Sequence, residues 1–218
     1  MGMTVRTNVA AMMASGSLGR TNKALTQSLS RISSGLRITK AADDAAGLGV
    51  ATNLETSVTS TRQAMRNTND GISIIQTAEG ATNEVTDILQ RMRELAVQSA
   101  SETLDDDERS YISDEFAELS DEVARIANVT EFNGLSLSNN SNTQLDVQVG
   151  IQNSSTSRIT IDLGDLRATS LAVDTGNVSL ANVTSAQEAI DNIDTALDSV
   201  NSYRSDFGSV QNRLDSAL

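Results

Sequence analysis

The sequence has 218 residues and a formal net charge of −13, and it contains no proline, cysteine or histidine. Without cysteine, disulfides and thiolate metal sites are unavailable, and without histidine the commonest general base and metal ligand is missing. No nucleotide-binding, nucleophile-elbow or HExxH motif occurs either. We therefore expect neither an enzyme nor a resident cofactor.

The charge is divided unevenly along the chain. Residues 1–40 hold six basic and no acidic side chains, so the remaining residues hold 10 of the 16 basic and all 29 acidic ones. This acidic bulk argues against a nucleic-acid partner, which needs a basic face. No stretch approaches the roughly 18 apolar residues of a membrane span, and no apolar core of a cleaved signal peptide is visible.

Residues 5–36 carry apolar side chains at helical spacing. From Leu18 onward the spacings are seven, four, three and four, which places on one stripe Leu18, Leu25, Leu29, Ile32 and Leu36. This pattern predicts an amphipathic helix. It either covers its own domain or binds another chain, and we favour the second because no later segment resembles its mate.

A glycine-bearing junction follows, in which Asp43 can cap a further helix. That helix leads through Val50, Leu54 and Val58 into residues 70–98, the most regular stretch of the sequence. Its apolar residues recur at spacings of four, three, four and three, namely Ala81, Val85, Ile88, Met92 and Leu95. The spacing predicts a long helix that packs along others.

Four acidic residues, 105–108, follow a polar break at residues 99–103. A calcium loop counted from Asp105 would need glycine at Ser110 and glutamate at Phe116, so we expect no metal site. The acids are better placed at the N-terminus of a helix. This second seam helix, antiparallel to the first, carries Ile112, Phe116, Leu119, Val123 and Ile126.

Asn133-Gly134 is expected to end the helical region. Apolar residues then alternate with polar ones over residues 145–151 and 159–163, which predicts a β-hairpin laid on the helices. Residues 140–143 and 169–181 are expected to form loops or short strands. The capping-box pattern from Ser185 to Glu188 predicts a last helix, with Ile190, Ile193, Leu197, Val200, Phe207 and Leu214 on its seam.

The expected fold is therefore mainly α: an elongated antiparallel coiled helical bundle with a small β-hairpin, plus an N-terminal amphipathic helical extension. We divide it into an N-terminal assembly segment (1–44), the N-terminal half of the helical core (45–134), the hairpin and loops (135–184), and a C-terminal core helix (185–218).

Six short motifs, in order, resemble the N-terminal half of bacterial flagellin, and a seventh resembles the start of its C-terminal half. They are SSGLRI (33–38), ADDAAGL (42–48), NDGIS (69–73), QTAEGA (76–81), LQRMRELAVQ (89–98), TEFNG (130–134) and FGSVQNRL (207–214). The resemblance covers residues 4–134 and about 185–218.

This resemblance implies a structural subunit of the flagellar filament that assembles with other flagellin subunits. In that family a bundle like residues 45–218 forms the outer tube, and the N-terminal extension lines the inner tube with a C-terminal helix. It implies export, without a cleaved signal peptide, by the flagellar export machinery and a chaperone to an extracellular filament. The family's C-terminal helix and large variable outer domains are expected to be missing here.

Flagellins are also ligands of a host Toll-like receptor. The receptor-contacting positions of the family align with Arg91, Leu95 and Glu115, although Leu95 also fits the helical seam and the two charged residues fit a solvated face. Two other functions stay open, a hook–filament junction protein and a coiled-coil binding module that docks a partner through its N-terminal helix. The QRMRELAVQ and TEFNG motifs favour flagellin.

Overall fold

The computed structural model describes residues 8–139 and 144–218. Within them lie the helices α1 (Val9–Ser34), α2 (Ala45–Ser99), α3 (Asp106–Val129) and α4 (Val183–Ala217). Between α3 and α4 lie the strands β1 (Glu131–Phe132), β2 (Leu135–Ser136), β3 (Gln144–Gln148) and β4 (Arg158–Asp162), with a short 3-10 helix at Ser155–Ser157. The expected mainly α fold with a small hairpin is confirmed; the loop expected at 140–143 lies outside the described residues.

The chain forms two compact units, Met1–Thr59 and Ser60–Leu218. Helix α2 contributes to both, because its first 15 residues, 45–59, belong to the first unit. Val50, Leu54 and Val58 in this part of α2 are all more than half exposed. The buried residues of α2 begin at Ala64, so the packed core belongs to the second unit.

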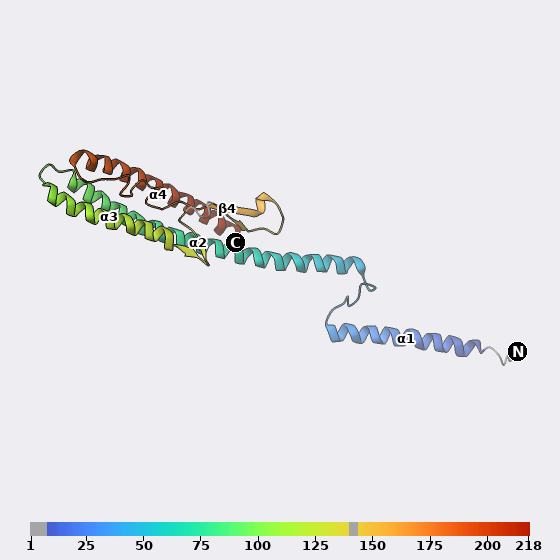
Figure 1. Ribbon diagram of the computed structural model, residues 1–218. Helices are drawn as coiled ribbons and strands as arrows, with labels where there is room; N and C mark the ends of the chain where they lie inside the picture. Colours follow the sequence, from blue (N-terminus) through green and yellow to red (C-terminus); the bar gives the residue numbers. More distant parts are fainter. Residues whose placement is uncertain (1–7, 140–143) are drawn as a thin grey trace. The chain divides into compact units, whose positions relative to one another are not determined.

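The second unit is an antiparallel bundle in which α3 and α4 run alongside α2 (Figure 1). Residues 81–96 of α2 share a core with residues 186–200 of α4, whereas residues 74–78 share one with residues 207–214. This crossed order shows that α4 runs antiparallel to α2. The ion pair between Arg91 and Glu115 and the short turn after Ser99 place α3 antiparallel to α2 as well.

The seam of α2 is wider than the sequence spacing suggests. Leu89 is fully buried, whereas Ile88, which was expected on the seam, is only partly buried and packs against the core from its margin. Because α2 contacts both α3 and α4, neighbouring pairs such as Val85 and Thr86 are buried together. A helix held between two partners buries a broader face than a two-helix seam.

The predicted β-hairpin is confirmed as β3 paired antiparallel with β4, with Val147 opposite Ile159 and Leu145 opposite Ile161. Its inward face covers the end of the bundle where α4 finishes. Val147, Ile159 and Ile161 form one core there with Phe207 and Leu214. The hairpin, which would be marginal alone, is thus held by the helices.

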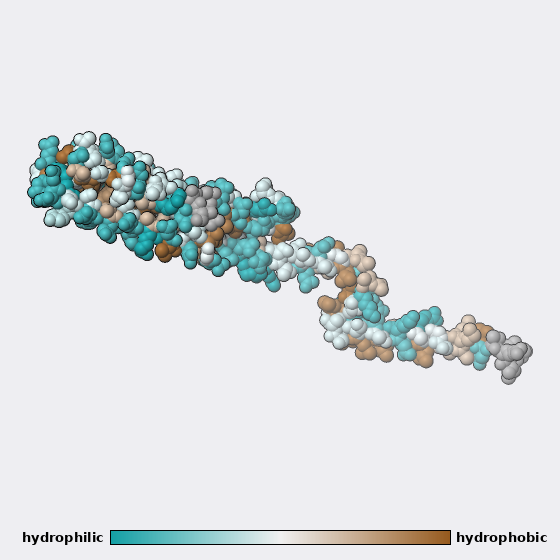
Figure 2. All heavy atoms as spheres, in the orientation of Figure 1, coloured by the Kyte–Doolittle hydropathy of each residue, from teal (hydrophilic) through white to brown (hydrophobic). Residues whose placement is uncertain are grey.

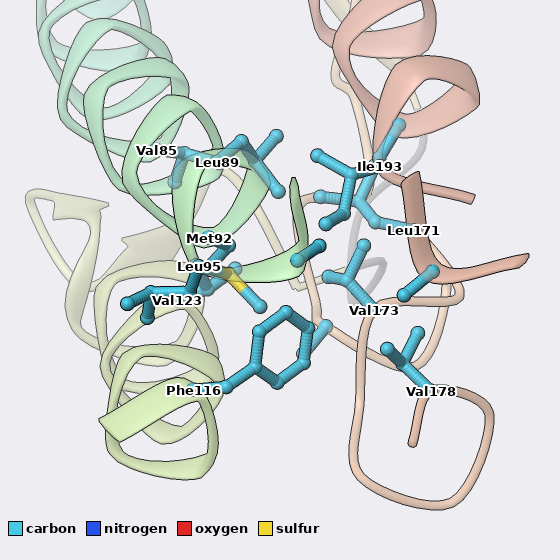
Figure 3. Packing of buried hydrophobic residues seen from close by; sticks show 14 of the residues in the cluster. Val85, Leu89, Met92, Leu95, Phe116, Val123, Leu171, Val173, Val178 and Ile193 are labelled. Carbon is cyan, nitrogen blue, oxygen red and sulfur yellow. The ribbon is translucent and has the colours of Figure 1, made fainter. Parts of the chain in front are cut away.

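The segment between β4 and α4 closes the other part of the core, without forming a strand. Leu171, Val173 and Val178 are buried, and Figure 3 shows them pointing toward residues of all three helices, among them Leu89, Phe116 and Ile193. The sequence expectation of loops or short strands at 169–181 is met by loops and turns. These loops nevertheless supply core side chains.

The starts of α4 and α2 differ from the sequence expectation. Helix α4 begins earlier than the Ser185–Glu188 pattern predicts, because Asn182 is its N-cap and forms the capping box with Ser185. At α2, Asp44 rather than Asp43 accepts the hydrogen bond of the first turn, from the Gly47 amide at 2.8 Å. In both cases the Asx residue directly before the first helical residue supplies the acceptor.

The helical region ends at Val129, before the Asn133-Gly134 pair. These two residues, with φ of 52° and 78°, form the two-residue turn between β1 and β2. Positive φ at both positions is what a tight hairpin turn requires. At the start of α3 the expected acidic N-terminus is present, as a capping box between Asp105 and Glu108.

No helix in the described part of the chain is long and apolar enough to cross a membrane. Among the same residues, no group of three or more acidic, histidine or cysteine side chains is placed to hold a metal ion.

Replacement of Leu89 tests the corrected seam. Leu89→Ala is expected to lower the free energy of unfolding by about 2–5 kcal/mol, because it leaves a cavity at a fully buried position. Ile88→Ala is the matched control and should cost clearly less. Urea unfolding followed by circular dichroism measures both; equal losses would contradict the register described here.

Candidate binding surfaces

Helix α1 exposes a continuous apolar stripe. It starts at Asn8, whose side chain accepts a hydrogen bond from the Ala11 amide, and ends at Gly35 with φ of 68°. None of its residues is buried. The side chains are 57–79% exposed at every position of what we call the α1 stripe, Leu18, Leu25, Leu29 and Ile32 on the helix and Leu36 just after it. Because α1 ends at Ser34 and Gly35 follows in the left-handed conformation, the expected helical position of Leu36 is wrong. Figure 2 shows apolar atoms, in brown, gathered along one side of this helix.

The polar side of α1 is occupied by the loop that follows the helix. Gln27 Nε2 donates to Asp43 Oδ1 at 2.7 Å, and the backbone amide and hydroxyl of Thr39 donate to Asp43 Oδ2 at 3.2 and 3.1 Å. These bonds, the one from the Thr39 amide first, lower the pKa of Asp43 below its ordinary value. A cavity of about 530 Å³ lies there, lined among others by Lys23 and Lys40.

In the first unit, polar groups on one side of α1 therefore form hydrogen bonds with the following loop, and the apolar side chains on the other side stay exposed to solvent. Gln27 lies on the opposite face of α1 from Leu18, Leu25 and Leu29 by helical geometry. The loop thus does not cover the stripe. Several large apolar side chains on one open helix face indicate an interaction surface.

A second exposed surface joins α2 to α3. Arg91 donates through Nε and Nη2 to Glu115 Oε1, at 3.1 and 2.7 Å, and through Nη1 to Glu94 Oε2 at 2.9 Å. We call these three residues the Arg91 patch. Glu115, and next Glu94, raise the pKa of Arg91 through these hydrogen bonds. The side chains are about half exposed or more.

The structure brings Arg91 and Glu115 together but turns Leu95 away from the patch. Leu95 is only 2% exposed and packs in the core (Figure 3). Glu94 was not predicted as part of this surface. Its position three residues after Arg91 is the sequence signal that could have identified it, because oppositely charged residues at this spacing meet on a helix.

The turn between α2 and α3 is fixed by a buried arginine. Arg109 is 6% exposed, and its guanidinium donates to the carbonyl oxygens of Ser99, Ser101 and Leu104. These oxygens belong to the end of α2 and to the turn, where the carbonyls lack helical partners. Asp105 and Asp106 stand four and three residues before Arg109, a spacing that is typical of ion pairs, so the sequence did not reveal that Arg109 binds carbonyl oxygens.

A second ion pair links α2 to α4. Arg93 Nε donates to Asp194 Oδ1 at 2.7 Å and Arg93 Nη2 to Oδ2 at 3.2 Å. This hydrogen bonding lowers the pKa of Asp194 below its ordinary value. The pair is exposed, so it orients the helices more than it stabilises them.

Arg109 offers a sharp stability test. Arg109→Met is expected to lower the free energy of unfolding by about 1–3 kcal/mol, because buried carbonyl oxygens lose their donors. Arg93→Met removes the exposed arginine that links α2 to α4 and should change the midpoint of urea unfolding little. Equal effects of the two substitutions would contradict the anchoring role of Arg109.

Comparisons with known proteins identify relatives over most of the chain. Residues 5–143 match the sequence model of the bacterial flagellin N-terminal helical region. A flagellin of Halalkalibacterium halodurans is 40% identical over 218 residues, covering 99% of this chain and 79% of the relative. A flagellin of Salmonella montevideo is 37% identical over 96% of this chain, and flagellin E of Vibrio cholerae is 46% identical over 78%. The chain spans only 42% and 45% of these last two proteins.

Solved structures of flagellar proteins are also similar to this chain. The crystal structure of Bacillus cereus flagellin has a TM-score of 0.60 and 32% identity, and it covers 69% of this chain and 85% of that protein. A putative flagellar hook-associated protein from Vibrio parahaemolyticus has a TM-score of 0.64 over 82% of this chain and 92% of its own. At 17% identity, this second likeness shows a shared fold alone.

Proposed function

Because the chain belongs to the bacterial flagellin family, we propose that the α1 stripe is the surface through which its subunits pack together. Flagellins are structural proteins and not enzymes, and the relatives identify this chain as a structural subunit of the extracellular flagellar filament. The finer question is which of its surfaces make the contacts between subunits.

The observation that carries the proposal is the exposure of the α1 stripe. Full burial of one of its large apolar side chains stabilises a packed state by about 1.5–3 kcal/mol of free energy. Within the first unit this gain is unrealised, since no residue of α1 is buried. Packing of the stripe against a helix of another subunit would supply it.

The rest of the chain then has distinct roles. Residues 1–44 are the assembly segment of the inner tube, and residues 45–134 and 185–218 are the helical core of the outer tube. Residues 135–184 complete that core with the hairpin and loops. In this proposal the subunit reaches the filament through the flagellar export machinery, with a chaperone and without a cleaved signal peptide.

The Arg91 patch supports a second proposed role, recognition by the flagellin-sensing Toll-like receptor of a host. The assigned residues are Arg91, Leu95 and Glu115. Arg91 and Glu115 present a charged, half-exposed pair held on two rigid helices, the kind of preorganised side chains that interfaces use. A guanidinium held by two carboxylates keeps one orientation and loses little freedom on binding.

The assembly role can be tested with charged substitutions in the stripe. Leu25→Glu combined with Leu29→Glu is expected to prevent the chain from co-sedimenting with fragments of preformed flagellar filaments, because charges replace the apolar contact. The urea unfolding midpoint of the second unit should stay unchanged, since both positions are exposed.

Ala24→Glu adds a charge to α1 at an exposed position away from the stripe and serves as the control. It should co-sediment like the unmodified chain. Co-sedimentation of the double variant at the unmodified level would contradict assembly through the α1 stripe.

The receptor role predicts an effect of Arg91→Ala. This substitution should weaken binding to the purified receptor ectodomain by about tenfold or more, as expected for an arginine at an interface centre. Helix content, followed by circular dichroism, should not change, because Arg91 is exposed. Surface plasmon resonance gives the affinity, and an unchanged affinity would argue against this surface.

A further inference from the structure

Tyr111 is exposed in a way that the packing of the bundle does not explain. Its side chain is 74% exposed, while the other four aromatic residues, Phe116, Phe132, Tyr203 and Phe207, are buried or half-buried. Tyr111 lies in the first half of α3, next to the buried Ile112. A large ring in water on a rigid helix offers contact area at a low cost in conformational entropy.

The Arg91 patch fixes where Tyr111 lies on the surface. Arg91 and Glu115 are joined by a 2.7 Å contact between antiparallel helices. One turn further along α2 is Leu95, and one turn back along α3 is Tyr111. Because both helices rise equally per residue, Tyr111 lies level with Leu95 and on the same face of α3 as Glu115.

The two apolar residues at this level have opposite exposures. Leu95 is 2% exposed and fills the core, whereas Tyr111 is 74% exposed. A partner that covers Arg91 and Glu115 thus meets the tyrosine ring before any part of Leu95. Leu95 can support this surface from within, but it offers almost no area of its own.

We propose that Tyr111 is the apolar anchor of the receptor-binding surface, beside Arg91 and Glu115. This inference rests on the proposed receptor role and deepens it, because it moves the apolar contact from Leu95 to a side chain that a partner can reach. Tyrosine and arginine are the residue types enriched among side chains that dominate binding energy. Here Tyr111 stands one helical turn from Glu115 on α3, and Glu115 is in contact with Arg91 on α2.

Charge defines the chemistry of the partner surface. The positions four and three residues before Tyr111 and three and four after it, which share its face of α3, are all acidic: Asp107, Glu108, Asp114 and Glu115. Within the described residues, only Glu115 of these four forms an ion pair. The surface that receives the ring therefore carries lysine or arginine side chains around an apolar pocket, and its affinity falls as salt screens them.

The experiment compares Tyr111→Ala, Tyr111→Phe and Arg91→Ala for binding to the purified receptor ectodomain. Tyr111→Ala should weaken binding by about tenfold or more, and Tyr111→Phe by less than about threefold because the ring remains. Val129→Ala removes another exposed apolar side chain, 62% exposed, at the other end of α3 and should have no effect. Binding of the unmodified chain should weaken between low and about 0.3 M salt.

The outcomes separate this inference from the role on which it rests. Loss of binding with Arg91→Ala but not with Tyr111→Ala would overturn the anchor and leave the receptor role in place. No loss with either would overturn both. Equal losses with Tyr111→Ala and Val129→Ala, or an effect of Tyr111→Ala on self-association alone, would also overturn the anchor. Thermal unfolding of each variant shows whether the exposed substitution left the bundle intact.

Discussion

The structure depends on the packing of α2 between two antiparallel neighbours. Leu89 and Met92, fully buried, stand at the centre of this contact, with Phe116 from α3 and Ile193 from α4 around them. Because two helices and the loop before α4 cover α2, its buried face is broad and its position is fixed. The hairpin, the turn held by Arg109 and the Arg91 patch are all set by this packing.

The two units differ in how far they satisfy their own apolar side chains. The second unit buries most of its large apolar residues in two clusters and leaves mainly polar and charged side chains outside. The first unit uses its polar groups internally, as Gln27 and Asp43 show, and leaves the α1 stripe in water. A subunit built this way has a stable core and still exposes an apolar helix face that another helix can cover.

Much of this fold could be predicted from the spacing of apolar residues in the sequence. The stripe on α1, the central helix, the antiparallel α3 and the β3–β4 hairpin follow from spacings of three, four and two residues. Small residues carried less signal: in α4 the fully buried positions include Ala186, Ala189 and Ala196, whereas Ile190 and Leu197 are only partly buried. Alanines at a helix contact let backbones approach closely, and that choice depends on the partner helices.

Other features depend on contacts distant in sequence, and local pattern could not reveal them. The buried side chains at Leu171, Val173 and Val178 sit on irregular backbone without a period. Arg109 binds carbonyl oxygens, which every residue has, so no particular partner residue marks it. For the same reason the alignment that assigned Leu95 to the receptor surface could not tell that its side chain faces inward.

Hydrogen exchange of the dilute protein and of the same protein within filaments tests most directly whether α1 is completed only by other subunits. The account predicts fast amide exchange over residues 9–34 in the dilute protein, because an unpacked helix opens readily, and slow exchange over residues 81–96. In filaments, residues 9–34 should become protected. Protection of α1 in the dilute monomer equal to that of the α2 core would contradict the account.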